Sequence, residues 1–407
     1  MKYKILAIML LISFLSMVFG LLTTLYIAYL SHKPFIFLTV GGAFYFIINI
    51  LLLKLILHKY KTKEKTIMFR NGIIISLSIF ILSAVPLFLS EDFEQKKTQE
   101  IMQQLEFWHL PNGDSIAYTF REAPQSIRNN PPIIFLHGGP GTPDMNRDIE
   151  YFSQLTQKGY DVYVYDQIGS GLSDRLDNPN KYSIQRDVDN LEEIRKEINA
   201  ENIILIGHSY GGEVAANYIA NYGNHVTKVV FSSPGAINPE DMSDGTLQNQ
   251  LSSQRKLILY AELLKPRVLF TYCLLQVNPK AAHAFAGDEE MDARFDKVYK
   301  ITQSALHAEG KSHNYPIHNL GFFANQTPQS WQYKQNILDP RNQLANWNGE
   351  ALIIKGDQDY LSDASAEDYE KAIERSILNY LKDAGHNVYQ DRPEKFMEML
   401  NNFLSNN

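Results

Sequence analysis

The sequence contains almost no cysteine, and its single one, Cys273, excludes a framework of internal disulfide bonds. Cys273 lies in an apolar segment typical of a packed helix, which favours a small buried side chain over a reactive thiol. Basic residues are outnumbered by acidic ones, with 38 Lys and Arg against 45 Asp and Glu, for a formal net charge of -7. No basic patch interleaved with aromatic residues occurs outside the apolar N-terminal region, so we expect no nucleic-acid partner.

Long apolar runs are confined to the first part of the chain, at residues 5–30, 35–57 and 73–89. The first two can cross a hydrocarbon core of about 30 Å, and the third can do so if residues 67–69 contribute. A cleaved signal peptide is the alternative for the first run, but its apolar stretch exceeds the usual length of roughly 7–15 residues. We therefore predict that residues 1–90 form three transmembrane helices that hold the protein in a lipid bilayer.

The positions of the lysines predict how these helices are oriented. Lys2 and Lys4 precede the first run, and four more lysines fill the loop at 59–65. Basic loops stay preferentially on the cytoplasmic side, so an odd number of crossings places the rest of the chain outside. We expect a linker at 91–104, followed by a soluble part that faces away from the cytoplasm.

From residue 105 onward, short β-rich runs alternate with helical patterns, which predicts a mostly parallel sheet covered by helices on both faces. Gly113 predicts a turn between an opening pair of strands, and residues 184–198 have the apolar spacing of an amphipathic helix. The predicted strands are 116–120, 133–136, 161–165, 203–206, 228–232, 351–355 and 377–381.

The alternation stops between residues 236 and 346, where helical patterns dominate. An insertion between two core strands is most simply a helical cap over a site, and a separate helical domain is the alternative. The prediction is therefore an α/β core in two parts, 105–235 and 347–407, with the cap between them.

A serine lies at a sharp turn between a predicted strand and a predicted helix. The sequence Gly-His-Ser-Tyr-Gly at 207–211 follows the apolar run at 203–206 and precedes a helical stretch at 213–222. This pattern is typical of a nucleophile elbow, in which glycines leave room for a strained serine whose hydroxyl is exposed. Ser209 is therefore the candidate nucleophile.

A nucleophilic serine needs a base to take its proton and an acid to orient that base. In the α/β-hydrolase fold these residues follow the serine in the order Asp, His. Asp359 follows the strand at 351–355, and His386 follows the strand at 377–381, both beyond the carboxyl ends where such sheets build their sites. We predict a triad of Ser209, His386 and Asp359, with Asp357 as the rival acid.

A glycine-rich loop supplies the candidate oxyanion hole. His-Gly-Gly-Pro-Gly at 137–141 follows the strand at 133–136, and the backbone N–H groups of Gly139 and Tyr210 are the predicted donors. The loop lacks the residues that follow in phosphate-binding loops.

Three histidines in the predicted cap could suggest a metal site: His307, His313 and His318. Their spacing does not place two imidazoles on one helical face, so we expect surface or cap-lining histidines, no metal and no cofactor.

These motifs together resemble the proline iminopeptidase group of α/β-hydrolases, from about residue 105 to the C-terminus. The matching residues are 137–141, Asp-Gln-Ile-Gly-Ser-Gly-Leu-Ser at 166–173, Gly-His-Ser-Tyr-Gly-Gly at 207–212, Asp359 and His386. The resemblance implies an α/β-hydrolase fold with a helical cap and acyl transfer to water without a cofactor. It makes Ser209 the nucleophile, His386 the general base and acid, and Asp359 its orienting carboxylate.

The same resemblance implies release of an N-terminal residue, often proline, from short peptides or aminoacyl substrates, with cap glutamates holding the free ammonium group. Two positions depart from the family pattern: Ile168 replaces an arginine, and Lys300 stands where a glutamate is expected. The remaining cap candidates for the ammonium group are Glu289, Glu290 and Glu309. A carboxylesterase or lipase-like hydrolase of acyl esters is the alternative function, followed by a catalytically idle binding module.

Overall fold

A computed structural model of the protein describes residues 2–60, 62–89, 105–240, 246–311, 319–329 and 338–405. The chain divides into two compact units, Met1–Phe93 with Ala261–Glu290 and Glu94–Tyr260 with Met291–Asn407. The segment predicted as a cap contributes to both units, and the predicted domain boundaries stay a prediction. The predicted linker at 91–104, His313 and His318 lie outside the described residues.

The first unit contains three long helices, α1 (Lys2–Leu30), α2 (Pro34–Leu57) and α3 (Thr62–Phe88). Each is long and apolar enough to cross a membrane. Helix α3 begins earlier than the predicted residue 73, because the polar residues ahead of its apolar run continue the helix. Buried hydroxyls pair between helices, since Ser13 Oγ and Ser76 Oγ are 2.8 Å apart and Tyr45 OH donates to Ser76 O at 2.8 Å. Two short helices complete the unit, α8 (Pro266–Val277) and α9 (Pro279–Phe285).

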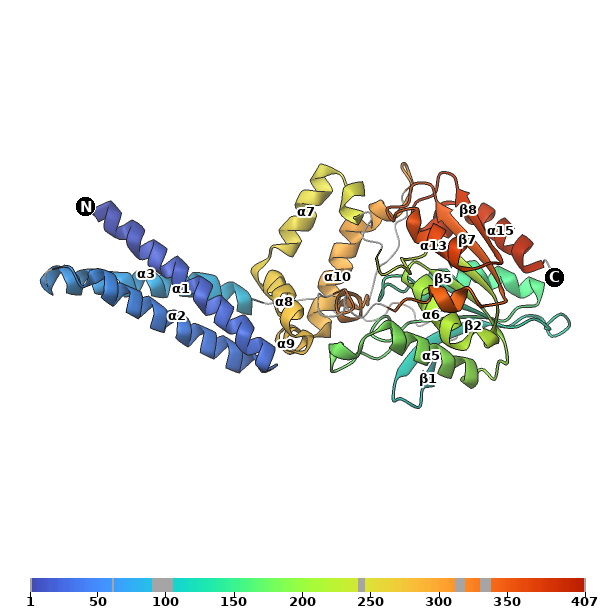
Figure 1. Ribbon diagram of the computed structural model, residues 1–407, viewed down its shortest axis with the longest axis horizontal. Helices are drawn as coiled ribbons and strands as arrows, with labels where there is room; N and C mark the ends of the chain where they lie inside the picture. The colour runs from blue at the N-terminus through green and yellow to red at the C-terminus, as the bar shows by residue number, and fades with distance from the viewer. Residues whose placement is uncertain are drawn as a thin grey trace. The chain divides into compact units, whose positions relative to one another are not determined.

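The second unit is built on one eight-stranded sheet in the order β1-β2-β4-β3-β5-β6-β7-β8. Strands β1, β2, β5, β7 and β8 are labelled in Figure 1. Strands β1 and β2 pair antiparallel across the predicted Gly113 turn, β2 pairs antiparallel with β4, and all remaining pairs are parallel. The strands are β1 (Glu106–His109), β2 (Ser115–Arg121), β3 (Ile133–Leu136), β4 (Val162–Tyr165), β5 (Ile203–His208), β6 (Val226–Ser232), β7 (Glu350–Gly356) and β8 (Ser376–Leu381). Every predicted strand is present, which confirms the predicted fold class.

The sheet is covered on both faces. Successive residues of a strand point to opposite faces, yet all four residues of β3 are buried. On one face, Phe135 of β3 packs in one cluster with Phe152 of α4 and Phe396 of α15. The helices of this unit are α4 (Met145–Phe152), α5 (Ile184–Glu197), α6 (Tyr210–Tyr222), α7 (Ser253–Leu263), α10 (Asp288–Thr302), α11 (Phe322–Gln326), α12 (Arg341–Leu344), α13 (Ala364–Ala372), α14 (Val388–Asp391) and α15 (Pro393–Ser405), of which α7 and α10 extend into the first unit. Its 3-10 turns are η1 (Ser153–Lys158), η2 (Pro179–Lys181), η3 (Gly223–His225), η4 (Leu247–Gln250) and η5 (Gln303–Leu306).

The strand order fixes where a site can form. Strand β3 lies between β4 and β5. The chain passes from β3 to β4 on one side and then to β5 on the other, so the strand order reverses at β3. In open α/β sheets, the loops at the carboxyl ends of the strands on either side of such a reversal leave a crevice for ligands. The loops after β3, β5, β7 and β8 carry the predicted oxyanion loop, nucleophile, acid and base, and therefore share one edge.

Candidate active site

Ser209 lies at the turn between β5 and α6, with φ 52° and ψ -120°. This uncommon backbone conformation is held by two hydrogen bonds, from Ser209 N to Ser232 O and from Gly235 N to Ser209 O, both at 3.0 Å. A Cβ at Gly207 would lie 2.4 Å from Gly211 O, and one at Gly211 would lie 2.1 Å from Leu136 O. Only glycine fits at these two positions, so the turn has the form predicted for an elbow.

The structure pairs His386 with Asp359. His386 Nδ1 lies 2.9 Å from Asp359 Oδ1, and the two side chains are only 4% and 0% exposed. The rival carboxylate, Asp357, is exposed and accepts a 3.3 Å hydrogen bond from the Ala384 backbone N–H instead. Of the two predicted acids, Asp359 is the one that contacts the predicted base.

A buried lysine completes the surroundings of Asp359. Lys355 Nζ lies 2.9 Å from Asp359 Oδ2, and its side chain is 1% exposed. Burial alone would raise the pKa of Asp359, but the charges and hydrogen bonds of His386 and Lys355 outweigh burial and hold that pKa well below its usual range. The carboxylate is therefore ionised and can only accept, so the proton of His386 sits on Nδ1 and leaves Nε2 free to act as a base.

Lys355 is absent from the sequence-based prediction of the site. The signal for it is a lysine inside the otherwise apolar run Leu-Ile-Ile-Lys-Gly of a buried strand, four residues before Asp359. A charge in such a run needs a buried partner.

His208, next to the predicted nucleophile, connects the elbow to the His386 loop. Its ring centroid lies 5.0 Å from that of His386, and its Nε2 lies 3.2 Å from Asn387 Oδ1. Burial first, and then the charge of His386, lower the pKa of His208 to about 3. The ring of His208 is therefore neutral at ordinary pH.

The predicted oxyanion loop lies against the elbow. A Cβ at Gly138 would be 3.0 Å from Ser209 Cβ. Tyr210 is the first residue of α6, so its N–H has no acceptor within the helix. Burial lowers the pKa of His137 to about 4, and its neutral ring accepts from Gln167 N at Nε2, at 2.9 Å. These contacts hold His137, the first residue of the glycine-rich loop, at the end of β3. The loop continues from there to Gly139.

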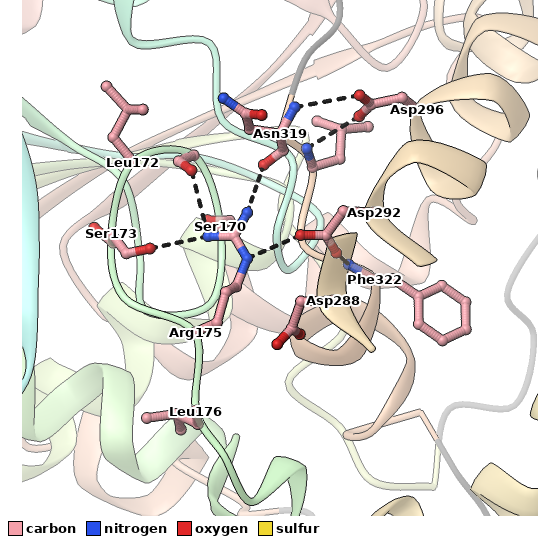
Figure 2. A network of polar contacts seen from close by, with 12 residues as sticks. Ser170, Leu172, Ser173, Arg175, Leu176, Asp288, Asp292, Asp296, Asn319 and Phe322 are labelled. Atoms are coloured by element: carbon pink, nitrogen blue, oxygen red, sulfur yellow. Dashed lines mark hydrogen bonds and ion pairs between the residues drawn. The ribbon is translucent and has the colours of Figure 1, made fainter. Parts of the chain in front are cut away.

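A polar network fixes helix α10 to the loop at 166–173 (Figure 2). Arg175 Nε lies 2.9 Å from Asp292 Oδ2, and the same guanidinium donates to Ser173 O at 2.9 Å and Asn319 O at 3.1 Å. The other Asp292 oxygen accepts from the backbone N–H of Phe322 at 2.8 Å. Arg175 thus joins the loop after β4, α10 and the segment at 319–322.

That segment in turn contacts the glycine-rich loop. Gly321 N donates to Gly141 O at 2.8 Å, and Asn325 Nδ2 donates to Pro140 O at 2.6 Å. Asp296 accepts from Leu320 N at 3.0 Å. The predicted oxyanion loop is therefore supported from the α10 side by a continuous chain of hydrogen bonds.

His307 is not on the surface, because its side chain is 1% exposed and its Nδ1 lies 2.8 Å from Asp391 Oδ1. The second oxygen of Asp391 accepts from Gly385 N and Ala308 N, both at 2.8 Å. The cap-side histidine is therefore part of the support for the loop that carries His386. Among the residues that the structure describes, no group of three or more His, Cys, Asp or Glu side chains could hold a metal ion.

The two departures from the family pattern have different surroundings. Ile168 is buried, next to Asp166, whose carboxylate accepts from Leu172 N at 2.8 Å and whose pKa burial raises to about 7. Lys300 is exposed and lines a cleft of about 520 Å³ together with Arg255 and Lys297.

None of the predicted cap glutamates lines that cleft. Glu290 forms an ion pair with Arg267 at 2.7 Å in the first unit, and Glu289 and Glu309 are exposed.

Comparisons with known proteins agree with this fold. A family model described as "alpha/beta hydrolase fold" matches residues 131–260, which include the glycine-rich loop and the elbow. A meta-cleavage product hydrolase from Pseudomonas fluorescens superposes with a TM-score of 0.50 and 17% identity, covering 74% of this chain and 97% of that one. The chain has the α/β-hydrolase fold.

Proteins that are similar to the chain in sequence include proline iminopeptidases. A proline iminopeptidase from Elizabethkingia meningoseptica is 25% identical over 286 residues, covering 67% of this chain and 89% of that protein. One from Saccharolobus solfataricus is 26% identical over 305 residues, covering 72% and 89%. In sequence, the chain is similar to these proline iminopeptidases.

Proposed function

We propose that the chain is a membrane-anchored serine hydrolase that releases N-terminal residues from short peptides, as a proline iminopeptidase does. The observation that carries the proposal is the buried Asp359–His386 hydrogen bond at the sheet edge where the Ser209 elbow lies. The names of the similar proteins support the peptide substrate, and the lysine positions support a hydrolase unit outside the cytoplasm.

The proposed reaction uses the protein's own side chains. His386 Nε2 takes the proton of Ser209 as the hydroxyl oxygen attacks the carbonyl carbon of the substrate. The Gly139 and Tyr210 N–H groups stabilise the negative oxygen that forms, and ionised Asp359 stabilises the charged imidazole. His386 then protonates the leaving amine. Water attacks the acyl-enzyme by the same steps and regenerates the serine.

A fluorophosphonate probe tests whether the serine is activated, because an activated serine oxygen attacks its phosphorus, forms an O–P bond and releases fluoride. We expect the full-length protein to be labelled, Ser209→Ala to remain unlabelled, and the exposed control Ser253→Ala to be labelled like the unmodified chain. Equal labelling of Ser209→Ala and the unmodified protein would refute the serine mechanism.

Lys300 lines the cleft that it shares with Arg255 and Lys297 and stands where the family resemblance implies a glutamate for the substrate's ammonium group, which favours a second candidate function, hydrolysis of acyl esters. Three cations line this cleft, and a cationic surface repels the free ammonium group of a peptide. Prolyl and other aminoacyl anilides, their N-acetylated forms and short acyl esters should be compared at equal enzyme concentration. An aminopeptidase cleaves the free-amine anilides far faster than the acetylated ones. Cleavage of esters alone, with no preference for a free amine, assigns the second function.

A further inference from the structure

The segment Ala261–Glu290 belongs to the same compact unit as the three long apolar helices, although it lies between β6 and β7 in the sequence. It contains helices α8 and α9, labelled in Figure 1. An insertion into a hydrolase core therefore contributes to the unit that carries the candidate membrane spans.

Side chains from this segment cap the ends of two of those spans. Arg267 Nη1 donates to Leu87 O at 2.7 Å in the last turn of α3, and Asn278 Nδ2 donates to Ala28 O at 2.8 Å in the last turn of α1. Carbonyls in the last turn of a helix have no partner within it, and a cation there also interacts favourably with the negative end of the helix dipole. The contacts place α8 and the start of α9 at the ends of the spans that lie opposite the lysine-rich loop.

Helix α8 is mostly apolar, and its uncharged polar residues are Thr271, Tyr272 and Gln276, of which Gln276 is exposed. Arg267 is its only charged residue, and its guanidinium is paired with Glu290 at 2.7 Å. Val268, Phe270, Leu274 and Leu275 are buried, whereas Leu269 is 46% exposed and Leu264, just before the helix, is 63% exposed. A surface helix of a water-soluble protein has one polar face, and a helix without one normally lies in a core or in lipid.

The length of α8 decides between crossing the bilayer and lying on it. Its 12 residues extend about 18 Å, well short of a hydrocarbon core of about 30 Å. Exposed aromatic residues, Tyr29 of α1 and Phe88 of α3, lie near the same span ends, and aromatic side chains favour the boundary between lipid and water.

We propose that α8 is a membrane-interfacial helix that inserts Leu264 and Leu269 into the outer boundary of the bilayer, next to the ends of α1 and α3. The partner of this surface is lipid, and binding depends on apolar burial, because α8 offers no unpaired basic face to acidic headgroups. The inference rests on the proposed membrane anchoring by α1–α3. It gives the protein a second attachment to the membrane, within the chain segment that separates the two halves of the hydrolase core.

Depth-dependent quenching tests the proposal. Cys273→Ser provides a cysteine-free background, since the chain has no other cysteine. Single cysteines replace Leu264 or Leu269, Leu51 as a reference exposed on the candidate span α2, and Glu289 as an exposed control in the same unit. Each full-length variant is labelled with an environment-sensitive fluorophore and reconstituted into phosphatidylcholine nanodiscs with or without nitroxide-labelled lipid.

We expect lipid nitroxides to quench the labels at Leu264 and Leu269 several-fold more than the label at Glu289, and a water-soluble quencher to show the opposite order. Lipid quenching at Leu51 without lipid quenching at Leu264 and Leu269 overturns the interfacial helix and leaves the anchoring intact. Absence of lipid quenching at Leu51 overturns the anchoring itself, and the inference with it.

Discussion

At the scale of single residues, the candidate site depends on one buried chain of polar contacts from Lys355 through Asp359 to His386. Removing a charge from water costs free energy, and a buried carboxylate is retained only where partners offset that cost. Asp359 has a partner on each oxygen, whereas Asp357 has one long hydrogen bond and solvent. Substitution of Asp359 and of Asp357 should therefore have different effects on activity.

Replacing Asp359 by Asn should lower kcat by about 10⁴-fold with little loss of folding, because an amide no longer selects the His386 tautomer with the proton on Nδ1. Asp357→Asn, two residues away and exposed, is the matched control and should keep nearly all activity. Steady-state kinetics on the best substrate of the panel, with circular dichroism to check folding, measures both. A large loss in Asp357→Asn and a small one in Asp359→Asn would show that the acid was assigned to the wrong residue.

The buried neutral ring of His208 should make the protein sensitive to acid. Its folded pKa, about 3, lies below the unfolded value of 6.5, so the unfolded chain binds the proton first as the pH falls. The stability is complete above pH 6.5 and is lost as the pH falls toward 3. Between pH 7 and pH 5 this one group costs about 2 kcal/mol of unfolding free energy.

In His208→Gln that titration is absent, so its Tm should fall less between pH 7 and pH 5 than the Tm of the unmodified protein. Other titrating groups, such as Asp166, are common to both proteins and largely cancel in the difference. Thermal unfolding of both proteins in detergent at the two pH values gives the comparison. Parallel declines of the two Tm values would mean that His208 is not held neutral.

The sequence predicted Ser209, His386, Asp359, Gly139 and Tyr210 from motifs and strand ends, and the structure brings their loops to one sheet edge. It did not predict Lys355 or the His307–Asp391 pair. Lys355 has a local signal, a lysine in a buried apolar strand four residues before Asp359, whereas His307 and Asp391 are 84 positions apart in the chain. Local patterns carry no information about such pairs.

At the scale of elements, side chains with several partners join α10 to the loops at the sheet edge. Arg175 is the central one, since it contacts α10, the loop after β4 and the segment at 319–322. The strands were predictable because continuous apolar runs between turn residues identify buried parallel strands. The α10 contacts were not, because an arginine after a loop has the same local sequence whether its partner is solvent or a distant helix.

Arg175→Met should lower the Tm and reduce kcat/KM, because Asp292 loses its cation and the support of the glycine-rich loop weakens. A hydrogen bond to a charged group contributes about 1.5–3 kcal/mol, and partial exposure of this pair places it at the lower end. A double-mutant cycle with Asp292→Asn should show that the two effects are not additive.

Arg341→Met is the matched control for Arg175→Met. Arg341 pairs with Asp339 at 2.7 Å, but both side chains are about one-third exposed, so its loss should change neither Tm nor kcat/KM. If Arg175→Met behaves like Arg341→Met, the network does not support the loop.

At the scale of the whole molecule, the proposed membrane anchoring predicts on which side of the bilayer the hydrolase unit lies. Three helices can span, and the basic residues gather at the N-terminus and in the loop between α2 and α3. Composition and length predicted these helices well, because a hydrocarbon core imposes a minimum apolar length. Orientation depends instead on loop charges read during insertion, which leave no trace in the packing of the helices.

C-terminal fusions decide the orientation, because alkaline phosphatase is active only outside the cytoplasm and green fluorescent protein fluoresces when it folds inside. An odd number of spans with both basic segments inside predicts an active phosphatase fusion and a dark fluorescent one. Replacing the four lysines at 59–65 by glutamine should reduce phosphatase activity at equal expression, since it removes the charge that retains this loop inside. A fluorescent fusion with an inactive phosphatase would place the hydrolase unit in the cytoplasm, and its substrates would then be intracellular.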